Sequence, residues 1–466
     1  MAGLNWRCLA AATGLLAACL WLTAPGWALE LGKADISLRS SNEYRLQWSD
    51  SPAAFMTVDE DRDQDFFTTL STEVKWREAG LTFAAMASYA KDLDGTRQGS
   101  IFQDYTDSRG SHRQDFECYY AYVEKADFLV RGLDLKAGRQ YAYGAETVHF
   151  DGLAATYANP AWLGLEAEAF GGRAVQHYSD PASADGIGGA NLSIRPLPGL
   201  ALDLNAVIFE ETSWEGAIFW QASDYWKLRG RLAFINDHTR FFDVGLEAVI
   251  PATGTVFDFS LYRRYAIASQ ADFLFDFTYT LDEALSAEIN RLYLMSEEGY
   301  LEFDCRVSQP LPFLEGTTVF VRYTNRSLSH GDRENLYNTD FQRISTGFDL
   351  EEIFGWHGFH LGAGVSYWWE DRDIFYEGES TSWFADVSQE LFERLKLSAG
   401  FHHKSEDVNS LLENQASTSW RLACEYQLCA FSSLELAYEY SEDDYYKDEL
   451  GVDHFNSVSL KLDFTF

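Results

Sequence analysis

Proline, positive charge and long apolar stretches are all in short supply in this sequence. Proline occurs only nine times in 466 residues, which favours a chain whose backbone N–H groups mostly form ladder hydrogen bonds. The 36 lysines and arginines stand against 72 acidic residues, and the net charge of −36 argues against a nucleic-acid partner, which requires a basic face. After the N-terminal region, no apolar run is long enough to span a membrane as a helix.

The one apolar run, at the N-terminus, has the features of a secretory signal. Arg7 supplies a small positive region, the apolar stretch covers Leu9–Leu22, and small residues at positions 26 and 28 fit a cleavage site after Ala28. We therefore expect residues 1–28 to be a signal peptide for export through the Sec pathway. Residues 29–466 would then form the mature protein.

Six cysteines are present, and their positions leave two alternatives open. Leu16–Cys19 resembles the lipobox of bacterial lipoproteins, so lipidation of Cys19 is an alternative to cleavage after Ala28. Cys424 and Cys429 flank an expected turn on the periplasmic side, an oxidising compartment, where they could form a hairpin-closing disulfide or remain two thiols. No CxxCH motif occurs, so the chain itself attaches no c-type haem.

The rest of the chain offers no boundary between domains. It has no proline-, serine- or glycine-rich linker and no abrupt change in composition, although soluble domains usually span ~100–200 residues. Aromatic residues make up 16% of the sequence, more than an ordinary core needs. A single large membrane barrel would use them as girdles at its two lipid–water interfaces.

Segments of alternating polarity are the repeating unit of the sequence. In the window 457–466, every even-numbered residue is apolar and every odd-numbered residue is polar or charged. A period of two gives a strand one apolar face, which meets lipid in a membrane barrel, and one polar face, which lines the lumen. We expect about 24 such strands, each near the ~9–11 residues that cross a bilayer, within a range of roughly 18–26. Further windows with this pattern are 226–234, 242–250, 257–261, 273–279, 301–307 and 434–440.

The connections between these segments alternate in length, as in outer-membrane barrels with short periplasmic turns and longer outer loops. Long polar connections are expected at 328–339, 370–380, 404–414 and 441–453, and short ones at 309–316, 351–356, 390–394 and 427–430. Most prolines fall on the short-turn side, and only Pro52 and Pro181 fall on the other. The predicted fold is all-β, a transmembrane antiparallel barrel with both termini periplasmic.

Two stretches resemble known proteins of Gram-negative bacteria. The strand ending in Phe466 resembles the signal that the barrel-assembly machinery reads. Gly138-Arg139-Gln140, with Phe150-Asp151-Gly152-Leu153, resembles the "GRQ … DGL" segment of alginate-export-type porins. The resemblance implies a passive pore with no cofactor and no catalytic residues. Substrate-specific porins usually fold a long loop into the lumen, and the longest candidate here, Lys91–His112, is modest.

Charged residues on the polar faces are the candidate pore lining. A basic row on one expected strand faces acidic residues on the next two strands. Opposed rows of charge create a field across a lumen, which orients polar solutes and sets selectivity. The competing interpretation is a salt-bridged ladder that only satisfies inward-pointing groups. The residues are Lys227, Arg229 and Arg231 on the basic side, and Asp243, Glu247 and Asp258 on the acidic side.

Acidic residues alternate in one expected outer loop, at Asp59, Asp61, Asp63 and Asp65. The glycine and glutamate positions of a calcium loop are missing, so we interpret this stretch as a solvated acidic loop and predict no metal site. A looser hypothesis is that acidic outer loops gather divalent cations that also bridge lipopolysaccharide phosphates. Acidic loops at the mouth would make a pore mildly cation-preferring, more so at low salt.

The sequence thus predicts an outer-membrane channel for passive diffusion of small hydrophilic solutes or ions, surrounded by outer-membrane lipid and lipopolysaccharide. No nucleophile elbow, phosphate loop or HExxH motif stands out, so no enzyme activity and no cofactor are expected. The alternative is a non-conducting scaffold with a periplasmic or cytochrome partner, such as the barrel sheath of a porin–cytochrome electron conduit. A third hypothesis, an adhesin or assembly barrel, would need larger outer loops or periplasmic domains.

Overall fold

One continuous antiparallel sheet of 22 strands makes up nearly all of the described chain. The computed structural model describes residues 34–49, 61–94, 114–175, 186–209, 212–265, 299–329, 340–352, 355–371, 378–408, 415–444, 447, 452 and 454–466. The elements are β1 (Ala34–Ser49), β2 (Asp61–Trp76), the 3-10 helix η1 (Arg77–Ala79), β3 (Leu81–Asp92), β4 (Gln114–Lys125), β5 (Leu133–Ala142), β6 (Val148–Asn159), β7 (Leu165–Ala174), β8 (Gly186–Leu197), β9 (Leu200–Ile208), β10 (Thr212–Ser223), β11 (Trp226–Ile235), β12 (His238–Ile250), β13 (Thr255–Arg264), β14 (Tyr300–Pro310), β15 (Thr317–Leu328), β16 (Asp340–Glu351), β17 (Phe359–Asp371), β18 (Gly378–Leu391), β19 (Leu395–Val408), β20 (Gln415–Cys429), β21 (Ser432–Asp443) and β22 (Phe455–Thr465).

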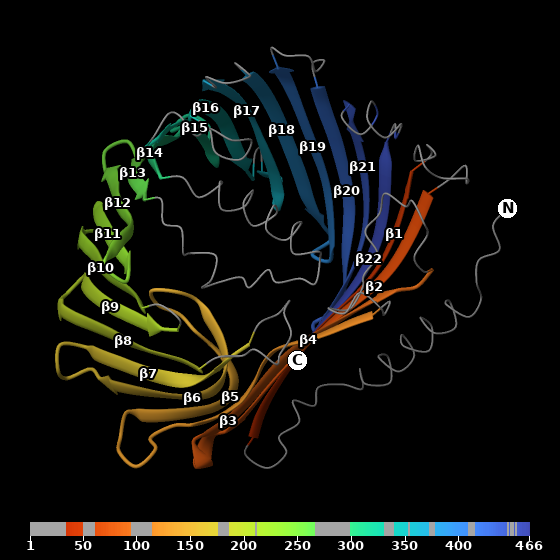
Figure 1. The fold of residues 1–466 in the computed structure, drawn as a ribbon. Coiled ribbons are helices and arrows are strands. Elements are labelled where there is room, and N and C mark those ends of the chain that lie inside the picture. Colours follow the sequence, from red (N-terminus) through yellow and green to blue (C-terminus); the bar gives the residue numbers. More distant parts are fainter. Residues whose placement is uncertain are drawn as a thin grey trace, which may run out of the picture.

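The sheet closes on itself through its first and last strands. Tyr44 of β1 lies opposite Phe66 of β2 on one side and opposite Leu460 of β22 on the other. Each remaining strand pairs with its two neighbours in the chain, so the sheet forms a ring (Figure 1). Closure gives the first and last strands partners for their backbone groups, which is what a membrane demands of a β-structure. The predicted fold class, an antiparallel barrel, is confirmed.

The strand number is 22 rather than about 24, although it falls inside the expected range. β13 pairs directly with β14, with Val256 opposite Ser308, so no further strand stands between them in the sheet. The predicted strand at 273–279 falls in this interval and lies outside the described residues.

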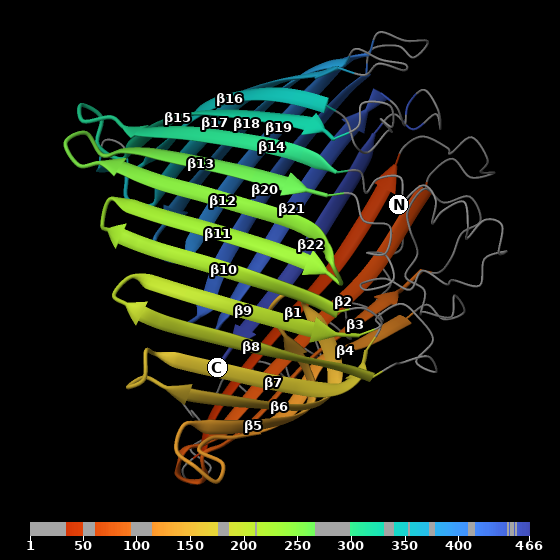
Figure 2. The same ribbon diagram turned by 60° about the vertical axis from the view of Figure 1, so that its left-hand side comes forward.

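The two ends of the barrel differ in their connections, as predicted. Short turns, the beginning of β1 and the C-terminus share one end, where Phe466 exchanges backbone hydrogen bonds with Leu38 (Figure 2). Pro160, Pro198 and Pro251 occupy turns at this end, whereas Pro52 and Pro181 lie outside the described residues. The connections at the opposite end are longer in sequence, with exceptions after β5, β9 and β11. We refer to these two ends as the turn end and the loop end.

Apolar side chains cover the outside of the barrel. Leu436 and Leu460, on neighbouring strands, are 50% and 42% exposed, and the polar residues that alternate with them point inward. Exposed aromatic residues gather near the turn end, where they would form one interfacial girdle. Lipid is the solvent that such a surface requires, so the barrel is membrane-spanning. The aromatic residues include Trp76, Trp162, Phe313, Trp356, Phe392 and Phe431.

Within the described part of the chain, no helix is long and apolar enough to cross a membrane.

The structure corrects the disulfide alternative. Cys424 and Cys429 are both free, and both belong to β20, which continues through the expected turn. Five residues of extended strand separate their Cα atoms by roughly 15 Å, about twice the reach of a disulfide. The turn itself lies at Ala430 and Phe431, so the two cysteines never face each other.

Candidate functional site

The predicted charged row lies on the inner face of β11, between acidic residues of both neighbouring strands. Lys227 Nζ lies 2.7 Å from Glu247 Oε1 on β12. Arg231 donates two hydrogen bonds, of 3.2 and 2.8 Å, to Glu215 on β10. Arg229 lies opposite Gly245, and its side chain occupies the space that a side chain at Gly245 would take.

These contacts favour the salt-bridged ladder for two of the three basic residues. Lys227 and Arg231 each have a carboxylate partner, while in the described part of the chain no carboxylate forms an ion pair with Arg229. Asp243 lies opposite Arg231, and Asp258 lies opposite both Glu247 and Arg306. Glu215 was missed from the sequence because its strand carries no clear alternation of polarity.

Ion pairs between adjacent strands continue around the inner wall. Arg322 contacts Asp304 at 2.7 Å, Arg326 contacts Glu302 at 2.7 Å, and Arg421 contacts Glu435 at 2.9 Å. Most of these side chains remain partly exposed, so the pairs are hydrated. The wall is therefore polar, with opposite charges interleaved.

The β5–β6 hairpin leaves the barrel wall at mid-height. β4 pairs with β5 only from Lys125 opposite Leu135 to Ala121 opposite Arg139. β5 stays paired with β6 beyond that point, as far as Ala142. Toward the loop end, β4 runs beside β3, while β5 and β6 turn away from it (Figures 1 and 2). The wall is thus split between β4 and β5 on the loop side of Arg139.

Glycines allow this sharp change of direction. Gly138 on β5 lies opposite Gly152 on β6, which lies opposite Gly172 on β7. A Cβ atom at Gly138 would lie 2.3 Å from the carbonyl oxygen of Ala121, and its φ of 129° is one that other residues rarely adopt. Only glycine permits so close an approach between β4 and the bent strand.

The tip of the hairpin, residues 143–147, docks on the inner faces of β8–β12. Asn191 of β8 donates a 2.9 Å hydrogen bond to the backbone oxygen of Tyr143. Glu146 accepts a 3.1 Å hydrogen bond from Ser213 of β10 and forms an ion pair with Arg240 of β12. Arg240 is the extra residue of a β-bulge, where the register between β11 and β12 shifts. The side chains of Glu146 and Arg240 are 5% and 16% exposed, so this pair is buried.

An apolar cluster lies beneath the hairpin on the inward side of the wall. Phe150 and Val207 are 0% and 1% exposed, and the rings of Phe150 and Phe170 are 5.2 Å apart. Such a cluster on inward faces means that packed side chains, not water, occupy this side of the lumen. The hairpin therefore narrows the barrel interior. Its other members are Ala142, Ala145, Val148, Ala154, Ala174 and Ile187.

The inward-folded segment differs from the one that the sequence offered. Lys91–His112 lies mostly outside the described residues, and a much shorter connection makes the inward fold. The two halves of the "GRQ … DGL" stretch are cross-strand partners in this hairpin. Arg139 donates hydrogen bonds of 2.8 and 2.9 Å to Asp151. Asp151 is on the same face of β6 as Leu153, which is 56% exposed, so this ion pair lies on the outer face.

No model of a protein family and no curated protein sequence matches this chain. Among solved structures it is similar to OccAB2 of Acinetobacter baumannii, with 10% identity, a TM-score of 0.43, and coverage of 93% of this chain and 98% of that one. It is also similar to a BenF-like porin from Pseudomonas fluorescens Pf-5, with 11% identity, a TM-score of 0.45, and coverage of 94% of this chain and 99% of that one. For the translocation pore of the P pilus usher PapC, the identity is 8%, the TM-score is 0.47, and the coverage is 92% of this chain and 99% of that one. Likeness at this level supports no statement about function, and the resemblance to alginate-export-type porins stays a prediction.

Proposed function

We propose that the protein is an outer-membrane porin through which small hydrophilic solutes or ions diffuse passively. The observation that carries this proposal is the inner wall, which bears hydrated ion pairs such as Lys227–Glu247 and Arg322–Asp304 inside a ring of 22 strands. Barrels of 16–18 strands already leave an aqueous channel, and larger ones are open unless something plugs them. The docked β5–β6 hairpin occupies one side of the lumen and would set the size limit of the solute.

The sheath around a cytochrome partner is the alternative. A sheath needs an inner surface that a protein can dry, whereas partly exposed charges such as Arg421 and Lys227 cost energy when dehydrated. Conductance in planar bilayers separates the two proposals. Well-folded protein that opens no channel would overturn the porin proposal and leave the sheath.

Barrel behaviour and export can be tested together. We expect protein from outer-membrane extracts to migrate faster on gels when unheated than when boiled, because the closed ladder resists detergent. The mass of the extracted protein should match cleavage after Ala28, with lipidation at Cys19 as the distinguishable alternative. A protein recovered soluble from the periplasm would contradict the membrane location.

The proposed pore should prefer cations weakly and in a salt-dependent way. The net charge is −36, whereas inner charges such as Lys227 and Arg231 have carboxylate partners, so we expect the bias to come from the acidic connections at the loop end. Reversal potentials in KCl gradients should show the preference at ~0.1 M salt, where the Debye length is ~10 Å, and lose most of it at ~1 M, where it is ~3 Å. Arg229→Gln and Lys227→Gln should each strengthen the preference, because each removes one positive charge from the lumen and Lys227→Gln also leaves Glu247 without its partner. Anion preference at low salt in the native protein would show instead that the inner basic row dominates.

A further inference from the structure

A group of carboxylates gathers on the inner side of the barrel wall at the loop end of β2 and β3. Arg62 and Lys91 lie at the same height of the wall, are exposed and point outward. Because charged side chains occupy the outer face there, this height lies beyond the apolar band that meets lipid. Asp63 and Asp65 of β2 point inward and are only 3% and 0% exposed. The interpretation of these residues as a solvated loop is therefore wrong, because β2 begins at Asp61 and directs both side chains into the structure.

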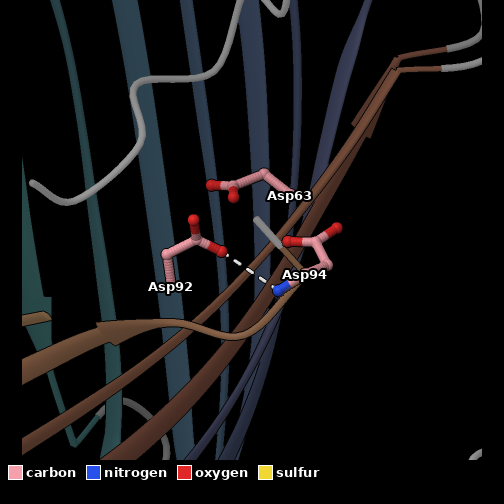
Figure 3. A group of neighbouring side chains, drawn as sticks. All are labelled: Asp63, Asp92 and Asp94. Atoms are coloured by element: carbon pink, nitrogen blue, oxygen red, sulfur yellow. Dashed lines mark hydrogen bonds between the residues drawn. The ribbon is translucent and has the colours of Figure 1, made fainter. Parts of the chain in front are cut away.

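Three of these aspartates converge on one point. One carboxylate oxygen from each of Asp63, Asp92 and Asp94 lies within 4.8 Å of the other two, and the side chains point toward one another (Figure 3). Backbone groups hold two of them in place. The N–H of Asp94 donates a 3.0 Å hydrogen bond to Asp92 Oδ1, and the N–H of Gln64 donates a 3.0 Å hydrogen bond to Asp94 Oδ1.

Asp63 supplies a second and independent observation. Its Oδ2 atom is buried and has no hydrogen-bond partner among the described residues, although the side chain is aimed into the group. On the neighbouring strand β1, Arg45 forms an ion pair with Asp65 at 3.0 Å. A buried carboxylate oxygen without a partner costs free energy unless a cation or a proton meets it.

We propose that Asp63, Asp92 and Asp94 bind one Ca²⁺ ion at the rim of the barrel. Ca²⁺ takes oxygen ligands at 2.3–2.6 Å, so two oxygens on one ion lie at most about 5 Å apart. The three carboxylate oxygens lie within 4.8 Å of one another and meet this condition. Water molecules would complete the six to eight ligands. Mg²⁺ fits less well, because it binds at 2.0–2.1 Å with strict octahedral geometry and usually keeps most of its water.

The site would tie the beginning of β2 to the end of β3. Asp63 comes from β2, Asp92 is the last residue of β3 and Asp94 follows it, so a bound ion cross-links the two strands where their ladder ends. The proposal is independent of whether the barrel conducts.

Equilibrium dialysis of the full mature protein in detergent, first against EDTA and then against ⁴⁵Ca²⁺, tests the site. We expect one ion per chain with a Kd on the order of 10⁻⁴ M or tighter, and a loss of at least about tenfold in affinity for Asp63→Asn and for Asp92→Asn. Asp349→Asn is the matched control, since Asp349 also points inward but is 46% exposed. The control should bind as the native protein does.

Folding is monitored by the temperature at which the fast-migrating gel band is lost. Ca²⁺ should raise this temperature for the native protein but not for Asp63→Asn. In EDTA, Asp63→Asn should lose the fast-migrating band at a higher temperature than the native protein does, because the neutral amide removes a buried charge from the group. The proposal is overturned if Asp63→Asn and Asp349→Asn bind Ca²⁺ equally, or if Mg²⁺ competes at the same concentration as Ca²⁺.

Discussion

Replacing Glu146 with alanine should release the β5–β6 hairpin from the wall and raise the single-channel conductance. The substitution leaves Arg240 with 16% of its side chain exposed and without the carboxylate that it contacts in the folded protein. Removing one partner of a buried ion pair costs about 3–5 kcal/mol, which shifts the balance between docked and released hairpin by roughly a hundredfold or more. Bilayer recordings should therefore show larger and more variable openings than those of the native protein.

Glu435→Ala is the control for this experiment. It removes the same kind of side chain and the same charge, but Glu435 pairs with Arg421, which is 56% exposed, and this contact joins two strands of the wall rather than the docked β5–β6 hairpin. An exposed pair contributes about 1 kcal/mol or less. Equal conductance changes in the two variants would show that the hairpin does not set the width of the pore.

The hairpin can also be followed without conductance. Ala145 at the tip is 5% exposed, so a cysteine placed there should resist maleimide labelling once the four free cysteines of the described chain are replaced by serine and Glu146 is kept. The same cysteine should label readily in combination with Glu146→Ala. Rapid labelling in both backgrounds would mean that the tip is not docked in solution.

Leu460→Arg should prevent assembly of the barrel or lower its stability severely. Leu460 is 42% exposed on the outer face, between Tyr44 of β1 and Leu436 of β21, at the seam that closes the ring. An arginine facing lipid near the midplane costs about 2–4 kcal/mol, and here it lies at the β1–β22 pairing that closes the ring. The fraction of outer-membrane protein with the fast-migrating gel band measures this effect.

Ser457→Arg on the same strand is the matched control. Ser457 points inward and lies opposite Glu439 of β21 and Gln47 of β1, so an arginine there reaches water and a carboxylate. Normal assembly of this variant, with failure of Leu460→Arg, would locate lipid on the even-numbered face. Equal assembly of both variants would contradict a lipid-facing surface at Leu460.

The sequence alone determined that the chain forms a barrel and which end carries the short connections. It also determined which side chains of each regularly alternating strand point outward. Alternation in windows such as 457–466 and 226–234 is a local property, because successive side chains of any strand point to opposite sides. The positions of the prolines also indicated which connections belong to the turn end, because Pro160 and Pro251 are disfavoured within a central ladder. Strand number was less certain, because an apolar window such as 273–279 has the same local pattern whether or not it enters the wall.

Only the tertiary structure decided which residues meet. Glu146 meets Arg240 although their elements are distant in sequence, and Asp63 meets Asp92 because the β2–β3 register places Asp65 opposite Asp92. A shift of one residue in β2 would turn Asp63 outward, so its burial depends on pairing rather than on its own neighbours in the chain. The cysteines were likewise misplaced by a local pattern: β20 continues to Cys429, through the first three residues of the turn expected at 427–430, so Cys424 and Cys429 lie on one strand. Local patterns assign each side chain to a face, whereas the contacts that form sites depend on register, which the whole closed ring sets.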